Sequence, residues 1–395
     1  MGRPGPRQVA RAQVVDAEDR LVELSHRIHA TPELAFEEER AAAWVGEALA
    51  DGGLSVEAGI CDLPTALVAT AGSGPLMLGI CAEYDALPGV GHACGHNVIA
   101  AAGVGAGLAL APLADDLGIT VKVFGTPAEE KGGGKCLMLE RGAFDGVHAA
   151  MMVHPSPVER DRMGCLAVAH LEIGYRGKSA HASAWPEQGV NAADALTVAQ
   201  VGVGLLRQHI KPTDRIHGIV TDGGDAPNII PERTGGAWYV RSRTLAELSE
   251  LMPKVHRCFE AGAVATGCEL TVTEASRPYS EFDHDTEMVA LYRRNAEALG
   301  RRFVDLPPEL ELRTAGSTDM ANVSLALPAI HPMLGLDSLP AVNHQPEFAA
   351  HCATPIADLA ALEGGLAMAW TCIDLAEDQT QRDRLFARAE AALSS

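Results

Sequence analysis

The first half of this chain alternates between segments with helical spacing and short apolar runs. Leu21, Leu24 and Ile28 fall on one face of a helix predicted for residues 14–29, which Pro32 ends. A second helix is predicted for residues 37–50, before Gly52-Gly53. Apolar runs typical of buried parallel strands follow at 75–82, 119–124 and 147–153, with predicted helices between them at 97–110 and 134–141. This order favours right-handed crossovers and a mostly parallel sheet.

The pattern changes near residue 164. Strands are predicted at 167–175, 216–221, 236–242 and 270–274, and long helices at 192–208 and 245–266. From about Asp283 onward, helical segments resume. The predicted fold class is therefore α/β. A catalytic domain with a mostly parallel sheet, residues 1–165 and 283–395, carries an inserted α+β domain, residues 166–282.

Length, composition and charge fit this picture. A chain of 395 residues is too long for one ordinary hydrophobic core, and 47% hydrophobic with 21% charged residues is typical of a soluble globular protein. The 52 acidic residues outnumber the 31 basic ones, which gives a formal charge of -21. Because this charge repels phosphate backbones, nucleic acid is not an expected partner.

The cysteines and the apolar runs bear on location. Nine cysteines without regular spacing predict no disulfide framework, which indicates a reducing compartment, and we expect a cytoplasmic protein. The segment Met1–Pro6 lacks the apolar core of a signal peptide. The most apolar stretch, 100–111, is too short and too rich in glycine to predict a membrane span.

Candidate chemistry gathers where the predicted strands end. Asp85 follows the strand at 76–82, Glu129-Glu130 follow the strand at 119–124, and His154 follows the strand at 147–153. The carboxyl ends of strands in an open α/β sheet meet at one edge, so these side chains are expected to converge. Five groups of residues are candidates to hold a pair of metal ions: His92-Ala93-Cys94-Gly95-His96, Glu129-Glu130, His154-Pro155, His181 and Asn343-His344-Gln345-Pro346.

Each group suggests a role. Cys94 and His96 precede a predicted helix, whose start favours a thiolate that can bridge two ions. In an extended turn Glu129 and Glu130 point different ways, so one can bind metal while the other acts as a base. His344 would complete the shell of the second ion.

Other interpretations of the same residues exist. A single histidine is more often a structural hydrogen-bonding group than a ligand, and a Glu-Glu pair is usually a solvated surface. Cys94 as a nucleophile with His96 as its base lacks an evident orienting Asn or Asp. The Gly103-x-Gly105-x-Gly107 pattern is a faint dinucleotide signal, but it lies inside a predicted helix, where close helix packing explains it better.

At these residues the sequence resembles the aminoacylase–carnosinase family of dinuclear metallopeptidases. The resemblance is closest to the amidohydrolase branch, which includes p-aminobenzoyl-glutamate hydrolase and related dipeptidases. It extends from His29-Ala30-Thr31-Pro32-Glu33-Leu34 to Asn343-His344-Gln345-Pro346. The specific motifs are Glu83-Tyr84-Asp85-Ala86-Leu87-Pro88, His92-Ala93-Cys94-Gly95-His96-Asn97, Gly125-Thr126-Pro127-Ala128-Glu129-Glu130 and Gly316-Ser317-Thr318-Asp319.

The resemblance implies a set of roles around two divalent ions. Glu129 would be the general base, and Asp85 would support the metal ligands without binding metal itself. Many relatives carry a ligand histidine at the position of Glu83, but the branch with Cys94 lacks it. Zinc suits a mixture of Cys, His and Glu, with manganese or cobalt as alternatives. The implied metal ligands are Cys94, His96, Glu130, His154 and His344.

The inserted domain resembles the dimerisation and lid domain of this family. The resemblance implies a homodimer in which His181 reaches the active site of the partner, while Asn228 and Arg241 bind substrate. The expected reaction is metal-dependent hydrolysis of the amide bond of an N-acyl or N-aroyl amino acid, a small molecule with a free carboxylate. A dipeptidase of the same family is the alternative, and a non-catalytic binding protein on this fold is a further one. Trp185 and Trp238-Tyr239 are candidates to line a pocket for an aromatic acyl group, although aromatic residues in a small domain are more often core.

Overall fold

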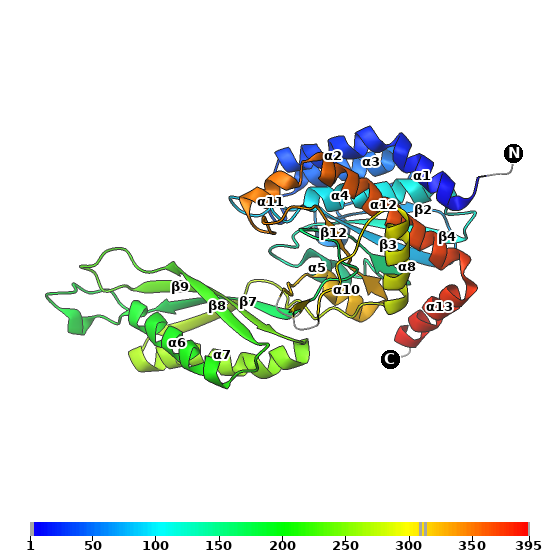
Figure 1. Cartoon of the computed structure of the whole chain (residues 1–395). Coiled ribbons are helices and arrows are strands. Elements are labelled where there is room, and N and C mark those ends of the chain that lie inside the picture. The colour runs from blue at the N-terminus through cyan, green and yellow to red at the C-terminus, as the bar shows by residue number, and fades with distance from the viewer. Residues whose placement is uncertain (1–3, 308–309, 312–313, 394–395) are drawn as a thin grey trace. The chain divides into compact units, whose positions relative to one another are not determined.

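A computed structural model describes residues 4–307, 310–311 and 314–393 and divides the chain into two units. Unit 1 comprises Met1–Gly164 and Phe282–Ser395, and unit 2 comprises Cys165–Glu281 (Figure 1). The chain thus leaves unit 1 once, forms unit 2 and returns. The sequence places the two boundaries after residues 165 and 282.

Unit 1 is built on a six-stranded sheet with the order β1-β2-β4-β3-β5-β11. The four strands β4, β3, β5 and β11 run parallel, which confirms the predicted fold class, whereas β1 and β2 pair in antiparallel fashion at one edge. A separate pair of short parallel strands, β6 (His154–Ser156) and β12 (Met333–Gly335), continues from β5 and β11. The bounds of the six strands are Ser55–Ala58 (β1), Leu67–Ala71 (β2), Leu76–Glu83 (β3), Ile119–Thr126 (β4), Ala149–Met151 (β5) and Ala329–Ile330 (β11).

The helix α4 (His96–Leu110) is buried along its whole length and lies between the sheet and the outer helices α1 and α2 (Figure 1). Its glycines permit this position. A Cβ atom on Gly103 would lie 2.8 Å from the Cβ of Ala82, and one on Gly107 would lie 2.7 Å from a methyl of Val123. The glycine pattern therefore serves close packing on the sheet, which confirms that interpretation.

The remaining helices of unit 1 cover both faces of the sheet. The predicted helix at 14–29 is in fact two, because the helix starts earlier, at Pro6, where the missing N–H costs nothing, and breaks at Ala17. The helix α5 is the one predicted at 134–141, whereas α10 was not predicted as a separate element; both pack over the opposite face from α4 (Figure 1). The bounds are Pro6–Asp16 (α1), Glu18–Ala30 (α2), Glu39–Asp51 (α3), Gly134–Glu140 (α5), Thr286–Ala298 (α8), Met320–Ala326 (α10), Pro346–His351 (α11), Pro355–Glu377 (α12) and Gln379–Leu393 (α13).

Two segments of the described chain are long and apolar enough to cross a membrane, contrary to the expectation from the sequence. They are His96–Leu113, where a short turn extends α4, and α12 (Pro355–Glu377). Within their apolar windows 89% and 72% of the residues are buried in the structure. The two segments pack against each other, so their composition reflects their place in the core of unit 1.

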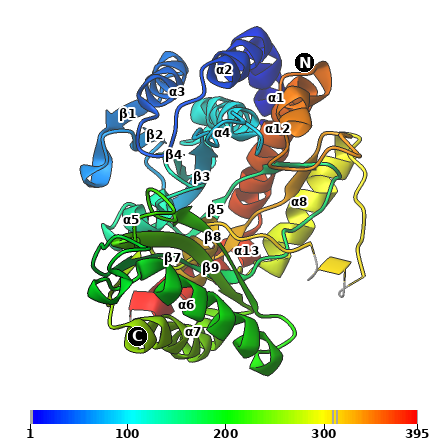
Figure 2. The ribbon, with the colours of Figure 1, turned by 90° about the vertical axis from the view of Figure 1, so that its left-hand side faces the viewer.

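Unit 2 is a four-stranded antiparallel sheet with the order β10-β7-β9-β8 and two helices on one face. Figure 2 shows α6 and α7 side by side along β7 and β9. Trp238 packs on Phe259 in the core between the sheet and the helices. The bounds are Ala167–Arg176 (β7), Ala192–Leu206 (α6), Arg215–Asp222 (β8), Arg233–Ser242 (β9), Leu245–Thr266 (α7) and Glu269–Glu274 (β10).

Candidate metal centre

The loop before α4 presents two candidate ligands on either side of a glycine. Gly95 has a φ of 80°, in the left-handed region that glycine adopts freely, and it caps the helix that begins at His96. A Cβ at this position would lie 2.6 Å from the ring of Pro155. Gly95 therefore lets the loop turn sharply and approach β6, which carries Cys94 and His96 into the same space.

The ring of His96 is fully buried and oriented by Asp85. Its Nδ1 lies 2.8 Å from Oδ1 of Asp85, and the other carboxylate oxygen accepts a hydrogen bond from the N–H of Glu130 at 2.9 Å. Burial alone would lower the pKa of His96, but the nearby carboxylates, Asp85 first, outweigh it and hold that pKa well above its usual value. Because Asp85 occupies Nδ1, Nε2 is the atom that faces the site, and it has no hydrogen-bond partner among the described residues.

The turn after β4 positions Glu129 and Glu130. Ala128, just before them, has a φ of 60°, which is uncommon for a residue with a Cβ. The N–H of Ala128 donates to Oε1 of the buried Glu38 at 2.8 Å, and this contact holds the turn. Burial, and then the charge of Asp85, raise the pKa of Glu38 to about 7.

Two histidines complete the cluster from distant parts of the chain. His154 begins β6, and its Nδ1 donates to the carbonyl of Pro155 at 2.8 Å, which leaves Nε2 facing Cys94. His344 also has a left-handed φ, 71°, and its N–H donates to the carbonyl of Ala93 at 2.8 Å. Its Nε2 lies 3.5 Å from the sulfur of Cys94, the same distance as that of His154.

This cluster contains three groups of donor atoms, and the atoms within each group all lie within 4.8 Å of one another. The groups are Cys94 with His96 and His154, Cys94 with Glu130 and His344, and His96 with Glu129 and Glu130. A sulfur and a nitrogen on one tetrahedral zinc ion lie about 3.5 Å apart, which matches both sulfur–nitrogen distances. The first two groups share Cys94, so its sulfur would contribute to the shells of both ions.

Buried atoms without partners support this fit. Nε2 of His96 and Oε1 of Glu130 are buried and have no hydrogen-bond partner among the described residues, although they lie only 3.9 Å apart. Burial, and then the charge of Glu130, raise the pKa of the Cys94 thiol well above its usual range. A bound cation would satisfy these free atoms and favour loss of the thiol proton.

The other predicted site residues, His181, Asn228 and Arg241, belong to unit 2. His181 is exposed, and its Nδ1 accepts hydrogen bonds from the N–H groups of Ser183 and Ala184, both at 3.2 Å. The ring proton is therefore on Nε2, which leaves His181 as a hydrogen-bond donor toward solvent. The N–H of Ala182 donates to the carbonyl of the exposed Asn228, so these two predicted residues lie on adjacent segments. Arg241 is half-buried on β9, over the ring of Tyr239.

Several buried charges near the cluster were not predicted as site residues. Glu83, Lys135 and Asp319 form one ion-pair network, and Glu38 holds the turn before Glu129. Glu83 and Asp319 lie in two of the family motifs, which imply no role for either residue. A single lysine or glutamate in a sequence is indistinguishable from a solvated one, so only the tertiary structure identifies them.

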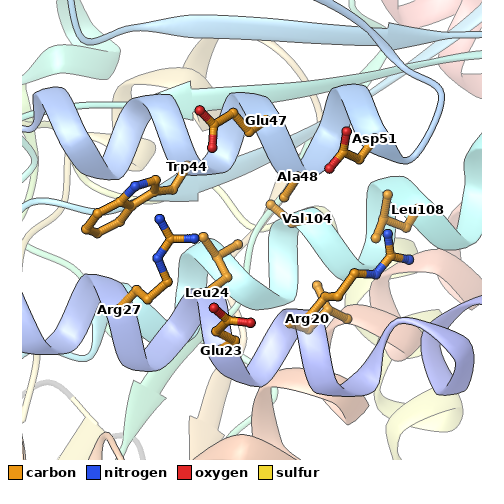
Figure 3. Close-up of a pocket in the computed structure, with 11 residues that line it drawn as sticks. Arg20, Glu23, Leu24, Arg27, Trp44, Glu47, Ala48, Asp51, Val104 and Leu108 are labelled. Carbon is orange, nitrogen blue, oxygen red and sulfur yellow. The ribbon is translucent and has the colours of Figure 1, made fainter.

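A separate groove in unit 1 lies between α2 and α3, with α4 as its floor (Figure 3). Its polar side chains carry both signs of charge, and Arg27 stacks on the ring of Trp44 at 4.4 Å. Neither cysteine nor histidine is among its lining residues. The groove therefore has the character of a charged helix–helix surface, whereas the donor atoms converge at the cluster around Cys94.

Comparison with known proteins bears on this cluster. A model of the peptidase family M20/M25/M40 matches residues 79–366. The Xaa-Arg dipeptidase of Mus musculus is 37% identical over 385 residues, which cover 93% of this chain and 88% of that protein. A p-aminobenzoyl-glutamate hydrolase chain of Escherichia coli (strain K12) is 29% identical over 62% of this chain and 56% of that protein. A dinuclear metal-binding peptidase of the M20 family from Bacillus subtilis shares the fold, with a TM-score of 0.67 at 21% identity over 91% of this chain and 98% of that chain.

Proposed function

This chain belongs to peptidase family M20/M25/M40 and hydrolyses amide bonds, as its motifs predicted, and we propose which of its residues act in the reaction and which substrate they act on. The proposed substrate is a small N-acyl or N-aroyl amino acid with a free carboxylate. The observation that most supports a metal-dependent reaction is the pair of donor groups that share the sulfur of Cys94.

We assign one ion to Cys94, His96 and His154, and the other to Cys94, Glu130 and His344. Zinc is the proposed metal because the donors mix thiolate, imidazole and carboxylate, with manganese or cobalt as alternatives. Bound ions would lower the pKa of the attacking water and offset the charge that develops on the scissile carbonyl.

Glu129 is the proposed general base. Its Oε2 lies 3.9 Å from Nε2 of His96, so the carboxylate is beside the donor cluster. A carboxylate oxygen of Glu129 would accept the proton of the attacking water and pass it to the leaving amine nitrogen. Burial and the neighbouring Glu83 and Glu130 raise the pKa of Glu129.

The residues of unit 2 are proposed to bind the substrate. The Nε2–H of His181 would donate to the oxyanion of the tetrahedral intermediate. Arg241, through its two parallel N–H groups, and Asn228 would hold the free carboxylate. We further propose a cytoplasmic homodimer in which each His181 serves the metal centre of the other protomer.

A dipeptidase activity is the second candidate, and a specific observation favours it. The similarity to the Xaa-Arg dipeptidase extends over 93% of this chain, more than the similarity to the aminobenzoyl-glutamate hydrolase. A dipeptide also presents an amide bond beside a free carboxylate, so the same residues would serve.

The two candidates differ in the acyl group, and a substrate panel separates them. N-acetyl and N-benzoyl amino acids and dipeptides ending in arginine, glutamate or alanine are tested with and without a chelator. We expect turnover of at least one class, its loss on chelation, and its recovery when zinc, manganese or cobalt is added. Turnover that survives complete metal removal would favour a cysteine nucleophile and contradict the proposal.

A further inference from the structure

Glu83 is a buried carboxylate that the proposed mechanism does not use. It ends β3, and its Oε1 accepts a hydrogen bond from Nζ of Lys135 at 2.5 Å. Its Oε2 has no hydrogen-bond partner among the described residues and lies 3.4 Å from Nε2 of His96. Glu83 thus places a carboxylate oxygen against the very nitrogen of His96 that faces the donor cluster.

Lys135 and Asp319 hold Glu83 in this place. The Lys135 ammonium lies 2.5 Å from Oδ1 of Asp319, and the Lys135 N–H donates to Oδ2 of the same carboxylate at 2.8 Å. All three side chains are fully buried. The network therefore joins the end of β3 to the starts of α5 and α10.

The charges in this network do not balance. One ammonium faces two carboxylates, so one negative charge stays uncompensated within the network. Asp319 alone would satisfy Lys135 through its ion pair, and burying a second carboxylate carries a large desolvation cost. That second carboxylate points its free oxygen at His96, which indicates a role toward a cation rather than in stability.

We propose that Glu83 is a positioning residue for the ion assigned to Cys94, His96 and His154, an inference that rests on the proposed function. Glu83 lies outside the three donor groups, so we assign it a positioning role beside His96 rather than a place in the shell of an ion. Its negative charge, fixed by Lys135, attracts a divalent cation to Nε2 of His96, while Asp85 orients the ring from the other side.

The test compares three variants with the wild-type chain by zinc stoichiometry and by competition titration against a fluorescent zinc chelator. Glu83→Gln keeps the shape and leaves Lys135 paired with Asp319. We expect its affinity for one of the two zinc ions to fall about 10–100-fold, with the other ion and the thermal midpoint little changed. Lys135→Met strands two buried carboxylates, so it should lower the thermal midpoint more than Glu83→Gln does.

The matched control is Glu159→Gln. Glu159 is another buried carboxylate of unit 1, paired with Arg301 and in none of the donor groups. It should lower stability and leave both zinc affinities unchanged. Zinc affinities of Glu83→Gln within twofold of wild type, or lowered only as much as in Glu159→Gln, would overturn the inference, and this holds even if Lys135→Met does not fold.

The same titration separates this inference from the proposed function. A wild-type chain that binds two zinc ions and loses activity without them, together with an unaffected Glu83→Gln, overturns only the role of Glu83. A wild-type chain that binds no zinc overturns the proposed function and, with it, this inference.

Discussion

Adjacent carboxylates in the turn after β4 have different surroundings. The backbone of Glu130 is fixed by Asp85, and its two carboxylate oxygens lie 3.9 Å from His96 and 3.8 Å from His344. Glu129 belongs to one donor group and Glu130 to two. This difference supports one carboxylate as a ligand and its neighbour as the proton carrier.

Replacing Glu129 by Gln tests this division of roles. The amide keeps the size of the side chain but cannot accept the proton, so kcat should fall about 10²–10⁴-fold. Metal content should remain that of the wild type, because the shells assigned to the two ions do not include Glu129. Steady-state kinetics together with elemental analysis of the same preparation measure both quantities.

The control for this variant is Glu47→Gln, on the exposed side of α3. It should change neither kcat nor metal content. A Glu129→Gln enzyme that keeps near wild-type turnover, or that loses one of its ions, would contradict the assignment of Glu129 as the base.

On the scale of elements, the sheet of unit 2 buries a histidine on the face opposite its helices. His170 on β7 lies across from Tyr239 on β9, with ring centres 4.2 Å apart, and its Nδ1 is 2.6 Å from the hydroxyl of Ser276. Burial, and then the positive charge of Arg241, lower the pKa of His170 to about 4. The folded sheet therefore favours the neutral ring.

This burial predicts a pH dependence for unit 2. The folded-state pKa of His170 is near 4, below the usual value near 6.5. The neutral ring therefore stabilises the folded unit fully above pH 6.5, and this stabilisation is lost as the pH falls toward 4. The loss should be about 3 kcal/mol in the free energy of unfolding. In His170→Gln this loss of stability at low pH should disappear. Hydrogen exchange of β7 and β9 at pH 6.5 and at pH 4 measures the loss in both proteins.

An exposed histidine provides the control. His209→Gln lies outside the sheet and should keep the pH dependence of the wild type. If His170→Gln loses as much protection as the wild type between the two pH values, the buried neutral ring does not account for the effect.

The elements also show where the sequence is informative. The apolar runs predict β3, β4 and α4 to within two residues, because buried parallel strands and a helix enclosed on all sides must be almost wholly apolar. The edge strand β1 and its neighbour β2 were missed; for β1 the reason is that three of its four residues are exposed and its sequence carries no apolar run. The start of α1 was missed because its moderately polar first turns lie outside the apolar pattern.

The candidate site was also predictable only in part from the sequence. Positions at strand ends and a helix start predict that Cys94, His96, Glu130 and His154 converge, whereas His344 joins them through the family resemblance, and the structure brings all five together. Lys135 and Glu38 were not predictable, because a buried ion pair depends on contacts between segments far apart in the chain. Sequence motifs thus identify the candidate donors and Asp85, whereas the buried charges of Lys135 and Glu38 require the fold.

On the scale of the whole molecule, every proposed metal ligand lies in unit 1. A ligand that binds only the folded state stabilises it by mass action, by about 2.7 kcal/mol when the free ion is 100-fold above its Kd. Chelation should therefore speed hydrogen exchange in α4 and β3 of unit 1 and leave β7 and β9 of unit 2 unchanged. An equal change in both units would contradict a metal centre confined to unit 1.

The proposed exchange of His181 between protomers is the last prediction, and it is testable by mixing two inactive variants. Glu129→Gln lacks the base, and His181→Asn lacks the donor and should lose about 10²–10³-fold in kcat. If His181 acts at the partner's metal centre, a mixed dimer has one site with both groups intact and one with neither. Protomers refolded together at equal amounts should then recover about one quarter of wild-type activity, because half of the dimers are mixed. If His181 acts within its own protomer, every site lacks one group and the mixture stays as inactive as its parts.

The matched control mixes Glu129→Gln with the Glu129→Gln, His181→Asn double variant, which leaves no site with a base in either arrangement. Recovery in the first mixture and none in the second would show that the active site is complete only in the dimer.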